Sequence, residues 1–240
     1  MYLFIKKIIK LIFPEFIYNF IGKKISNSIF FHYVRYQGLL NIDYKIDDNI
    51  CFGKIENDFF LEKIKNSKLY LEYGSGYSTF LANKLNKKFF SIESDKDFYR
   101  YIKKRISNPN ILLYEFGLVG FYSRPLRVIK EKSVINDYCV KILEYFEDNK
   151  MIPDLILVDG RFRVLNILHL YRFFYNKEKK PFIIIDDYAS SHGSGRDYLH
   201  VVENFFFIKK VGRFGVIEDI KKENFNSLEK YIEDHQFDSR

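Results

Sequence analysis

Two glycines followed by an acidic residue give this sequence its clearest chemical signal. The run Leu69–Thr79 is a short apolar segment that leads into Gly74 and Gly76 and then into hydroxyl side chains. Glycine allows a tight turn and a close approach of the backbone to a ligand, and the helix expected next offers N–H groups at its first turn. Glu93 ends the following apolar run and could accept hydrogen bonds from a ribose diol. The pattern indicates a nucleotide-type cofactor site; the alternative is a plain glycine turn with a solvated Glu93.

The residue at position 79 distinguishes between two classes of cofactor. A dinucleotide-binding loop has a third glycine at this position, because the helix must pack closely on the strand beneath the pyrophosphate. This chain has Thr79 instead. The loop therefore disfavours NAD as the cofactor.

Acidic side chains also follow two later apolar runs. The segment 159–163 begins with Asp159, and the segment 186–192 begins with Asp186 and Asp187. Because ligands bind outside the carboxyl ends of the strands in open α/β sheets, we expect these segments to meet the glycine loop. Like charges on one rim must be offset by a ligand, a metal or basic neighbours, although each acid could instead cap a helix. The basic candidates are Arg124, Arg161, Arg163 and Arg196.

His192 is the predicted general base, because it lies in the polar segment 190–195 beside the acids that end the fifth strand. The alternative is a solvated loop histidine. His169 and His200 fall in helical patterns, where we expect them to pack or to face solvent. No Ser-His-Asp or Cys-His arrangement occurs at a recognisable spacing, so acyl-enzyme chemistry has no support.

Apolar runs that alternate with amphipathic segments predict the elements that position these side chains. Continuous apolar strands separated by helices are typical of a parallel sheet covered on both faces. Strands are expected at 69–73, 89–93, 111–116, within 153–163 and at 181–187, followed by a hairpin of 206–210 and 213–218. Helices are expected at 58–66, 78–85, 96–106 and 133–146. The predicted fold is a Rossmann-like, mostly parallel seven-stranded sheet with helices on both faces, a C-terminal antiparallel hairpin and an N-terminal helical extension.

The glycine loop resembles motif I of class I S-adenosylmethionine-dependent methyltransferases. Glu72, Gly74 and Gly76 match the motif, and Glu93 matches the acidic position that follows it. The resemblance implies that the loop cradles the methionine part of S-adenosylmethionine and that Glu93 binds the ribose hydroxyls. The implied cofactor-binding residues are Glu72, Gly74, Ser75, Gly76, Ser78, Thr79, Glu93 and Asp159.

A second resemblance lies at the fourth strand. The run Asp154–Arg163 ends in Asp-Gly-Arg-Phe-Arg, which is similar to a bacterial branch of the same family, as is Gly212-Arg213 in the closing hairpin. The resemblance covers about residues 68–218. It implies that Asp159 faces the methionine part or the acceptor.

The acids also resemble those of catechol and caffeoyl-CoA type O-methyltransferases, which hold a divalent cation. That family has an Asp after strand four and an Asp-Asn pair after strand five, where this chain has Asp159, Asp186 and Asp187. The resemblance implies Mg²⁺ or Mn²⁺, which would lower the pKa of an acceptor hydroxyl. The chain departs from that pattern at Asp187, which replaces Asn, and at the Gly-Arg after Asp159. The predicted catalytic residues are Asp159, Asp187 and His192.

The predicted function is methyl transfer to an oxygen of a small or glycan-like acceptor, with nitrogen as the lesser alternative. Arg161 and Arg163 either pair with Asp159 or bind an anionic acceptor such as a phosphate or a sugar nucleotide, and Arg124 and Arg196 are further candidates. Two other functions stay open. One is a non-catalytic Rossmann-like scaffold attached to a membrane, and the other is an enzyme that uses NAD or a nucleotide sugar.

Length and composition suit one α/β domain with an extension. The chain has 240 residues, of which 47% are hydrophobic. We divide it into a basic amphipathic extension (1–36), a connecting helix and loops (37–67) and the methyltransferase-like domain (68–240). Cys51 and Cys139 are isolated, which indicates neither a disulfide framework nor a zinc site and fits a reducing cytoplasm.

The basic charge is concentrated in the extension. Residues 1–36 carry a net charge of +5 out of +8 for the whole chain, so the body lacks the basic cluster that a nucleic-acid partner would need. No apolar run is long enough to span a bilayer. The basic and aromatic segment 3–21 could lie on an anionic membrane at its cytoplasmic face, in keeping with polysaccharide synthesis there. The alternative is packing on the domain or on a second subunit of a homodimer.

Overall fold

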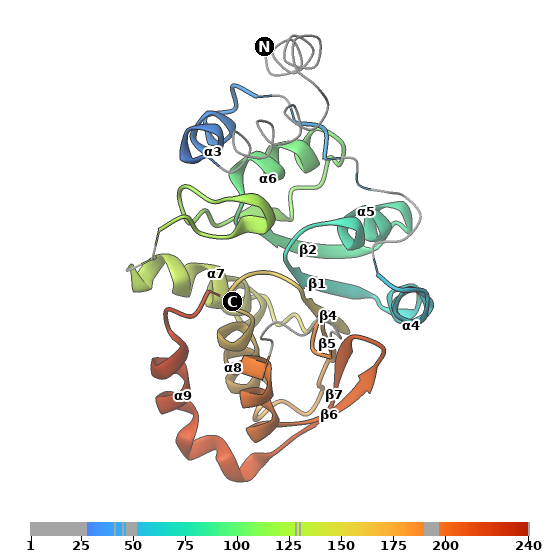
Figure 1. Cartoon of the computed structure of the whole chain (residues 1–240). Coiled ribbons are helices and arrows are strands. Elements are labelled where there is room, and N and C mark those ends of the chain that lie inside the picture. Colours follow the sequence, from blue (N-terminus) through green and yellow to red (C-terminus); the bar gives the residue numbers. More distant parts are fainter. Residues whose placement is uncertain are drawn as a thin grey trace.

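The computed structural model describes residues 28–40, 42–44, 46, 52–127, 129, 131–189 and 197–239. These residues form a seven-stranded sheet with the strand order β3-β2-β1-β4-β5-β7-β6 (Figure 1). β1 to β5 run parallel, β7 is antiparallel to β5, and β6 is antiparallel to β7. The predicted fold class is confirmed, including the closing antiparallel hairpin.

The elements follow one another much as the apolar pattern predicts. The strands are β1 (Leu69–Tyr73), β2 (Lys88–Glu93), β3 (Ile111–Leu113), β4 (Leu155–Val158), β5 (Phe182–Ile185), β6 (Phe206–Val211) and β7 (Phe214–Ile220). The α-helices are α3 (Ile29–Tyr36), α4 (Lys54–Asn66), α5 (Tyr77–Lys84), α6 (Lys96–Lys103), α7 (Lys132–Asp148), α8 (Arg163–Phe174) and α9 (Leu228–His235). The 3₁₀ segments are η1 (Phe121–Ser123), η2 (Asp197–Asn204) and η3 (Lys222–Ser227). β3 is shorter than expected, because its pairing with β2 ends where Leu113 faces Glu93.

Two apolar cores lie on opposite faces of the sheet. Phe60 of α4 and Ile102 of α6 belong to one core, together with Tyr70 of β1. Phe146 of α7 and Leu168 of α8 belong to the other. Every residue of β1 and β4 is buried, as expected for central strands covered by helices on both sides. This packing holds the carboxyl ends of the strands at one rim of the sheet.

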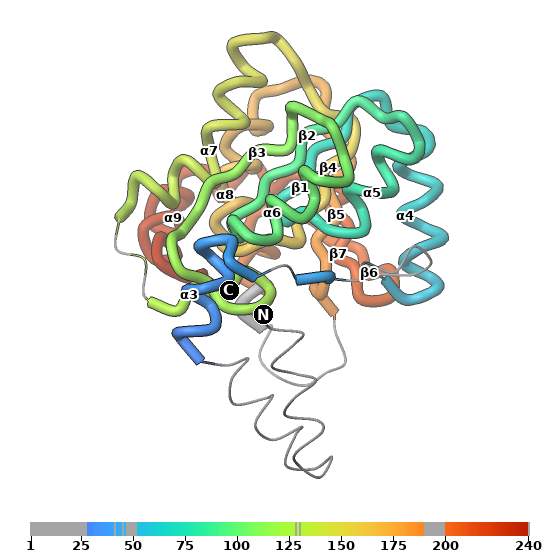
Figure 2. Tube along the Cα trace, turned by 90° about the horizontal axis from the view of Figure 1, so that it is seen from above, coloured from blue at the N-terminus to red at the C-terminus, as the bar shows by residue number. Residues whose placement is uncertain are grey.

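Helix α3 packs beside α6 and the segment that follows β3 (Figure 2). Ser28 caps it, accepting a hydrogen bond from the N–H of Phe31 at 3.1 Å. Within the described residues, no helix combines the length and the hydropathy needed to cross a membrane.

Candidate functional site

The glycine loop joins β1 to α5 and lies against the end of β4. Gly74 has a φ of +92° and donates its N–H to the carbonyl of Ile92 at 2.8 Å. A Cβ at Gly74 would lie 2.8 Å from backbone atoms of Asp159 and Gly160, so only glycine fits this turn. A Cβ at Gly76 would meet nothing within 4 Å. The loop therefore leaves open space beside the first turn of α5.

Glu72 stabilises the conformation of this loop through buried hydrogen bonds. It is fully buried, and its carboxylate accepts hydrogen bonds from the Tyr70 hydroxyl at 2.8 Å, the Ser78 hydroxyl at 2.5 Å and the Thr79 hydroxyl. Thr79 Oγ1 also accepts the N–H of Gly76 at 2.8 Å. Burial raises the pKa of Glu72, and the hydrogen bonds from the hydroxyl groups oppose that rise. Direct contact of Glu72, Ser78 or Thr79 with a cofactor stays a prediction.

Glu93 lies at the end of β2, next to the glycine loop. Its Oε1 accepts the N–H groups of Ser94 and Asp95, both at 2.7 Å, and the hydroxyl of Ser123 at 3.0 Å. Burial raises the pKa of Glu93 to about 7, and the hydrogen bonds from Asp95, Ser94 and Ser123 limit the rise. Tyr122 and Ser123 have φ values of +59° and +56°, so the loop that reaches Glu93 stores backbone strain.

Arg35 of α3 holds that loop in place. Its Nη2 lies 2.8 Å from Asp95 Oδ2 and donates to the carbonyls of Val119 at 2.8 Å and Gly120 at 3.1 Å. Asp95 also caps α6, as its position before that helix suggests. Arg35 is 1% exposed. The charge of Arg35 is therefore used in an ion pair inside the domain. Including Arg35 in the positive charge of a membrane-facing extension is wrong.

Three acids meet where β4 and β5 end. Asp159, Asp186 and Asp187 each offer a carboxylate oxygen, and these oxygens lie within 4.8 Å of one another. Asp159 extends the pairing of β4 by donating its N–H to the carbonyl of Tyr73 at 2.9 Å. Burial raises the pKa of Asp159, as does the charge of Asp186, and Arg163 opposes both.

Arg163 lies beneath this acid cluster and is 3% exposed. Its Nη2 lies 2.8 Å from Asp159 Oδ1, and its Nη1 lies 3.4 Å from Asp187 Oδ2. The same guanidinium donates to the carbonyls of Gly160 at 3.1 Å and Asp186 at 2.9 Å. These contacts favour a structural role for Arg163, and its contact with an acceptor stays a prediction.

Arg213 approaches the acid cluster from the hairpin. Its Nε and Nη2 bind the two carboxylate oxygens of Asp186, both at 2.7 Å. Its Nε also lies 3.7 Å from Asp187 Oδ1, and its backbone N–H donates to Glu56 Oε1 at 2.7 Å. The hairpin thus supplies a second cation to the cluster.

The remaining predicted site residues are spread around these two centres. Ser75 Oγ lies 2.7 Å from Ser91 Oγ on the neighbouring strand β2. Arg124 is exposed in the loop that carries Ser123, and Arg161 is half-buried at the end of β4. His192 and Arg196 lie outside the described residues, so their predicted roles stay predictions.

Sequence reasoning missed several groups that shape the site. Ser123 lies in the loop after β3, and its hydrogen bond to Glu93 was not predicted. Arg213 was noted only for its family pattern. Tyr138 of α7 gave no signal, yet its buried hydroxyl lies against Gly160, where any side chain would collide with it.

Comparison with known proteins supports this fold. No protein-family model and no curated protein matches the chain. The crystal structure of a methyltransferase-like protein from Silicibacter pomeroyi DSS-3 matches it with a TM-score of 0.63 and 25% sequence identity, over 82% of this chain and all of that one. The fold is methyltransferase-like. The structural match covers 82% of the chain, so it does not depend on the glycine loop alone.

Proposed function

We propose that this protein is an S-adenosylmethionine-dependent methyltransferase that acts on a hydroxyl group of a small or glycan-like acceptor. One observation carries the proposal. β1 and β2 are adjacent parallel strands; the open turn at Gly76 follows β1, and Glu93 is the last residue of β2. The fold that contains them matches a methyltransferase-like protein. Ligands bind at this end of open α/β sheets.

The loop residues have the geometry to hold such a cofactor. Gly74 keeps the turn close to β4, and the space beside Gly76 admits a ligand next to the first turn of α5. Glu93 can accept hydrogen bonds from both hydroxyls of a ribose. When bound, S-adenosylmethionine supplies a methyl group already activated by its sulfonium, so the main task of the protein is alignment.

The acid cluster faces the acceptor side of the proposed site. Asp159, Asp186 and Asp187 bring three negative charges, which Arg163 and Arg213 offset in part. Asp159 and Asp187 are the described candidates for taking the acceptor proton, and His192, in the polar segment 190–195, is the candidate outside the described residues. Arg124, which is exposed, and Arg161, which is half-buried, are the candidates that we propose for binding an anionic acceptor.

A graded change at Gly76 tests the cofactor cradle. Gly76 has extended backbone that any residue adopts, so Gly76→Ala should leave the stability equal or slightly higher. The added methyl group would occupy the open space, at a cost of about 1 kcal/mol, which corresponds to an affinity about fivefold weaker. Equilibrium dialysis with labelled S-adenosylmethionine measures the affinity, and Gly76→Val should weaken it further. Unchanged affinity in both variants would place the cofactor elsewhere.

The same acids have the right chemistry for Mg²⁺ or Mn²⁺, because carboxylate oxygens are the ligands that hard cations prefer. However, the guanidinium groups of Arg163 and Arg213 already occupy oxygens of all three carboxylates. A cation would have to displace these buried pairs. We therefore propose a reaction with no step that depends on a metal.

Chelation tests this point directly. Transfer of labelled methyl groups to the acceptor should stay within about twofold of its starting rate in excess EDTA, because the arginines already pair with the acids. A metal-dependent enzyme of this type would lose its activity, because the cation would activate the acceptor hydroxyl. Loss of activity in EDTA with recovery on addition of Mg²⁺ or Mn²⁺ would contradict the metal-free proposal.

A further inference from the structure

Helix α3 has an apolar face that no described part of the protein covers. Ile29, Phe30 and Tyr33 lie on this face and are 66%, 76% and 51% exposed, and Leu39 just beyond the helix is 71% exposed. We call these four residues the α3 apolar face. The other side of the helix carries Arg35, which binds the loop next to Glu93. One side of α3 therefore serves the proposed cofactor site while the other presents large apolar groups to the surroundings, which is typical of an interaction surface.

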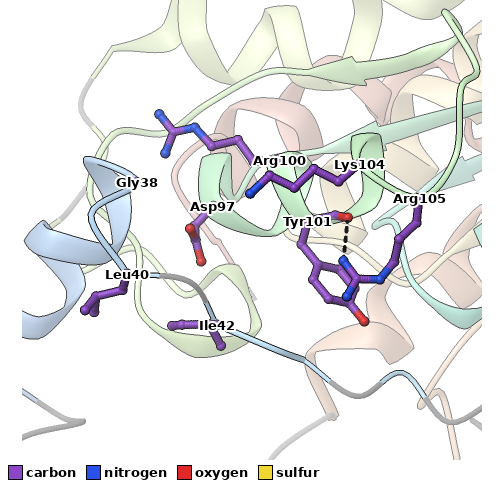
Figure 3. A pocket seen from close by; sticks show the side chains of 8 residues that line it. All are labelled: Gly38, Leu40, Ile42, Asp97, Arg100, Tyr101, Lys104 and Arg105. Atoms are coloured by element: carbon purple, nitrogen blue, oxygen red, sulfur yellow. Dashed lines mark hydrogen bonds between the residues drawn. The ribbon is translucent and has the colours of Figure 1, made fainter. Parts of the chain in front are cut away.

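A small basic pocket lies at the C-terminal end of the same helix (Figure 3). It has a volume of about 40 Å³, and its lining residues are Gly38, Leu40, Ile42, Asp97, Arg100, Tyr101, Lys104 and Arg105. Three of these side chains are cationic and one is acidic. The acidic one, Asp97, accepts a hydrogen bond from the Tyr44 hydroxyl.

Arg100 of this pocket lies on α6, and Lys104 and Arg105 lie in the turn that follows the helix. The Arg105 guanidinium lies 3.6 Å from the centre of the Tyr101 ring, and Arg100 Nη1 donates to the carbonyl of Tyr36 at 2.7 Å. Lys104, on the next turn after Arg100, is exposed. Arg105 Nη2 also lies 3.7 Å from Asp43 Oδ1, so Asp43 and Asp97 offset part of the positive charge that lies next to the apolar groups of Leu39 and Leu40.

The sequence that precedes α3 has the same character. Residues 1–27 carry a net charge of +4, and 3–21 are rich in Ile, Leu and Phe. This segment joins the helix at Ser28, beside Ile29 and Phe30. The N-terminal sequence therefore has the same combination of apolar and cationic residues as the described surface around α3.

We propose that the α3 apolar face and the basic pocket bind an anionic membrane surface. Aliphatic and aromatic groups insert at the boundary between headgroups and acyl chains, and Lys and Arg attract anionic phosphates. A symmetric contact with a second copy fits less well, because it would bring two basic segments and two basic pockets together. Membrane binding goes beyond the proposed methyl transfer and places the loop held by Arg35 near the lipid surface.

Co-sedimentation of the full-length protein with vesicles tests the proposal without any methyl donor. The vesicles contain phosphatidylcholine alone or phosphatidylcholine with phosphatidylglycerol. The protein should bind the anionic vesicles, and added salt should release it. Replacing Ile29 and Phe30 together by Ser should weaken binding about tenfold or more. Phe207→Ser is the matched control, because Phe207 is an exposed aromatic residue on β6 and its loss should change nothing.

A second pair of variants tests the basic pocket. Changing Lys104 and Arg105 together to Gln should weaken binding to anionic vesicles several-fold and reduce its salt dependence. Lys141→Gln, which removes an exposed cation from α7, should have little effect. Equal binding to neutral vesicles, or full binding by the variants at Ile29 and Phe30, would overturn the proposal. So would light scattering that shows a dimer converted to monomer by the serine variant while no form binds vesicles.

Discussion

Replacing Arg163 with methionine is expected to lower the free energy of unfolding by about 3 kcal/mol. The guanidinium is buried and binds the carboxylates of Asp159 and Asp187 as well as the carbonyls of Gly160 and Asp186. Methionine fills a similar volume, but it leaves these acceptors without a donor and the acids without their nearest positive charge. For a domain of this size, the loss corresponds to a melting temperature lower by about 6–12 °C.

Urea unfolding followed by circular dichroism measures this loss. Arg172→Met is the matched control, because Arg172 lies on the same helix, is exposed and pairs with Glu229 at the surface. Its loss should change the free energy of unfolding by less than about 1 kcal/mol. If Arg163→Met and Arg172→Met have the same free energy of unfolding, Arg163 has no structural role. The sequence-based prediction that Arg163 binds an acceptor would then be favoured.

Replacing Glu93 with glutamine should weaken the binding of S-adenosylmethionine by roughly tenfold to a hundredfold. The charge-assisted hydrogen bonds from a ribose diol to the carboxylate would be lost, at about 1.5–3 kcal/mol. The wild-type affinity should rise by about tenfold from pH 6 to pH 8, because only the ionised form of a group with a pKa of about 7 makes these bonds. The glutamine variant should show no such rise.

The same substitution should stabilise the fold at high pH. The folded protein raises the pKa of Glu93 from 4.5 to about 7, so it binds more protons than the unfolded chain between these values. The free energy of unfolding of the wild type therefore falls as the pH rises through this window, by roughly 3 kcal/mol in all. Glutamine removes that loss, so its advantage should be full above pH 7 and absent below pH 4.5.

Glu115→Gln is the control for both measurements, because Glu115 follows the next strand along the sheet and pairs with Lys96 at the surface. It should alter neither the cofactor affinity nor the pH profile. A Glu93 variant that binds as tightly as the wild type would assign the ribose contact to another residue.

The parts of the fold that were predictable are those fixed by local chemistry. β4 is wholly apolar and β1 is apolar except for Glu72, which is typical of central parallel strands, and Gly74 requires a φ that other residues rarely adopt. The meeting of Glu93 and Asp159 with the glycine loop follows from the parallel order, since the carboxyl ends of such strands share one rim.

The parts that were missed depend on contacts between distant segments. Arg35 lies 84 residues from Val119, whose carbonyl it binds, and nothing in its local sequence distinguishes it from the lysines that precede it in the chain. Ser123 reaches Glu93 only because the loop is bent by two residues with positive φ. For Arg163, pairing with Asp159 was one of two open alternatives, and the structure contains that ion pair; its burial could not be predicted, because it is decided by how β4, β5 and α8 pack together.

Calorimetric titration of the full-length protein at pH 8 with S-adenosylmethionine, S-adenosylhomocysteine and NAD tests the central claim most directly. At this pH Glu93 is mostly ionised, so binding is not limited by its protonation. The proposed function predicts that both sulfur-containing ligands bind with affinities in the micromolar range and that NAD binds much more weakly, because Thr79 stands where a dinucleotide loop needs glycine. Tighter binding of NAD, or no binding of either sulfur-containing ligand, would contradict it.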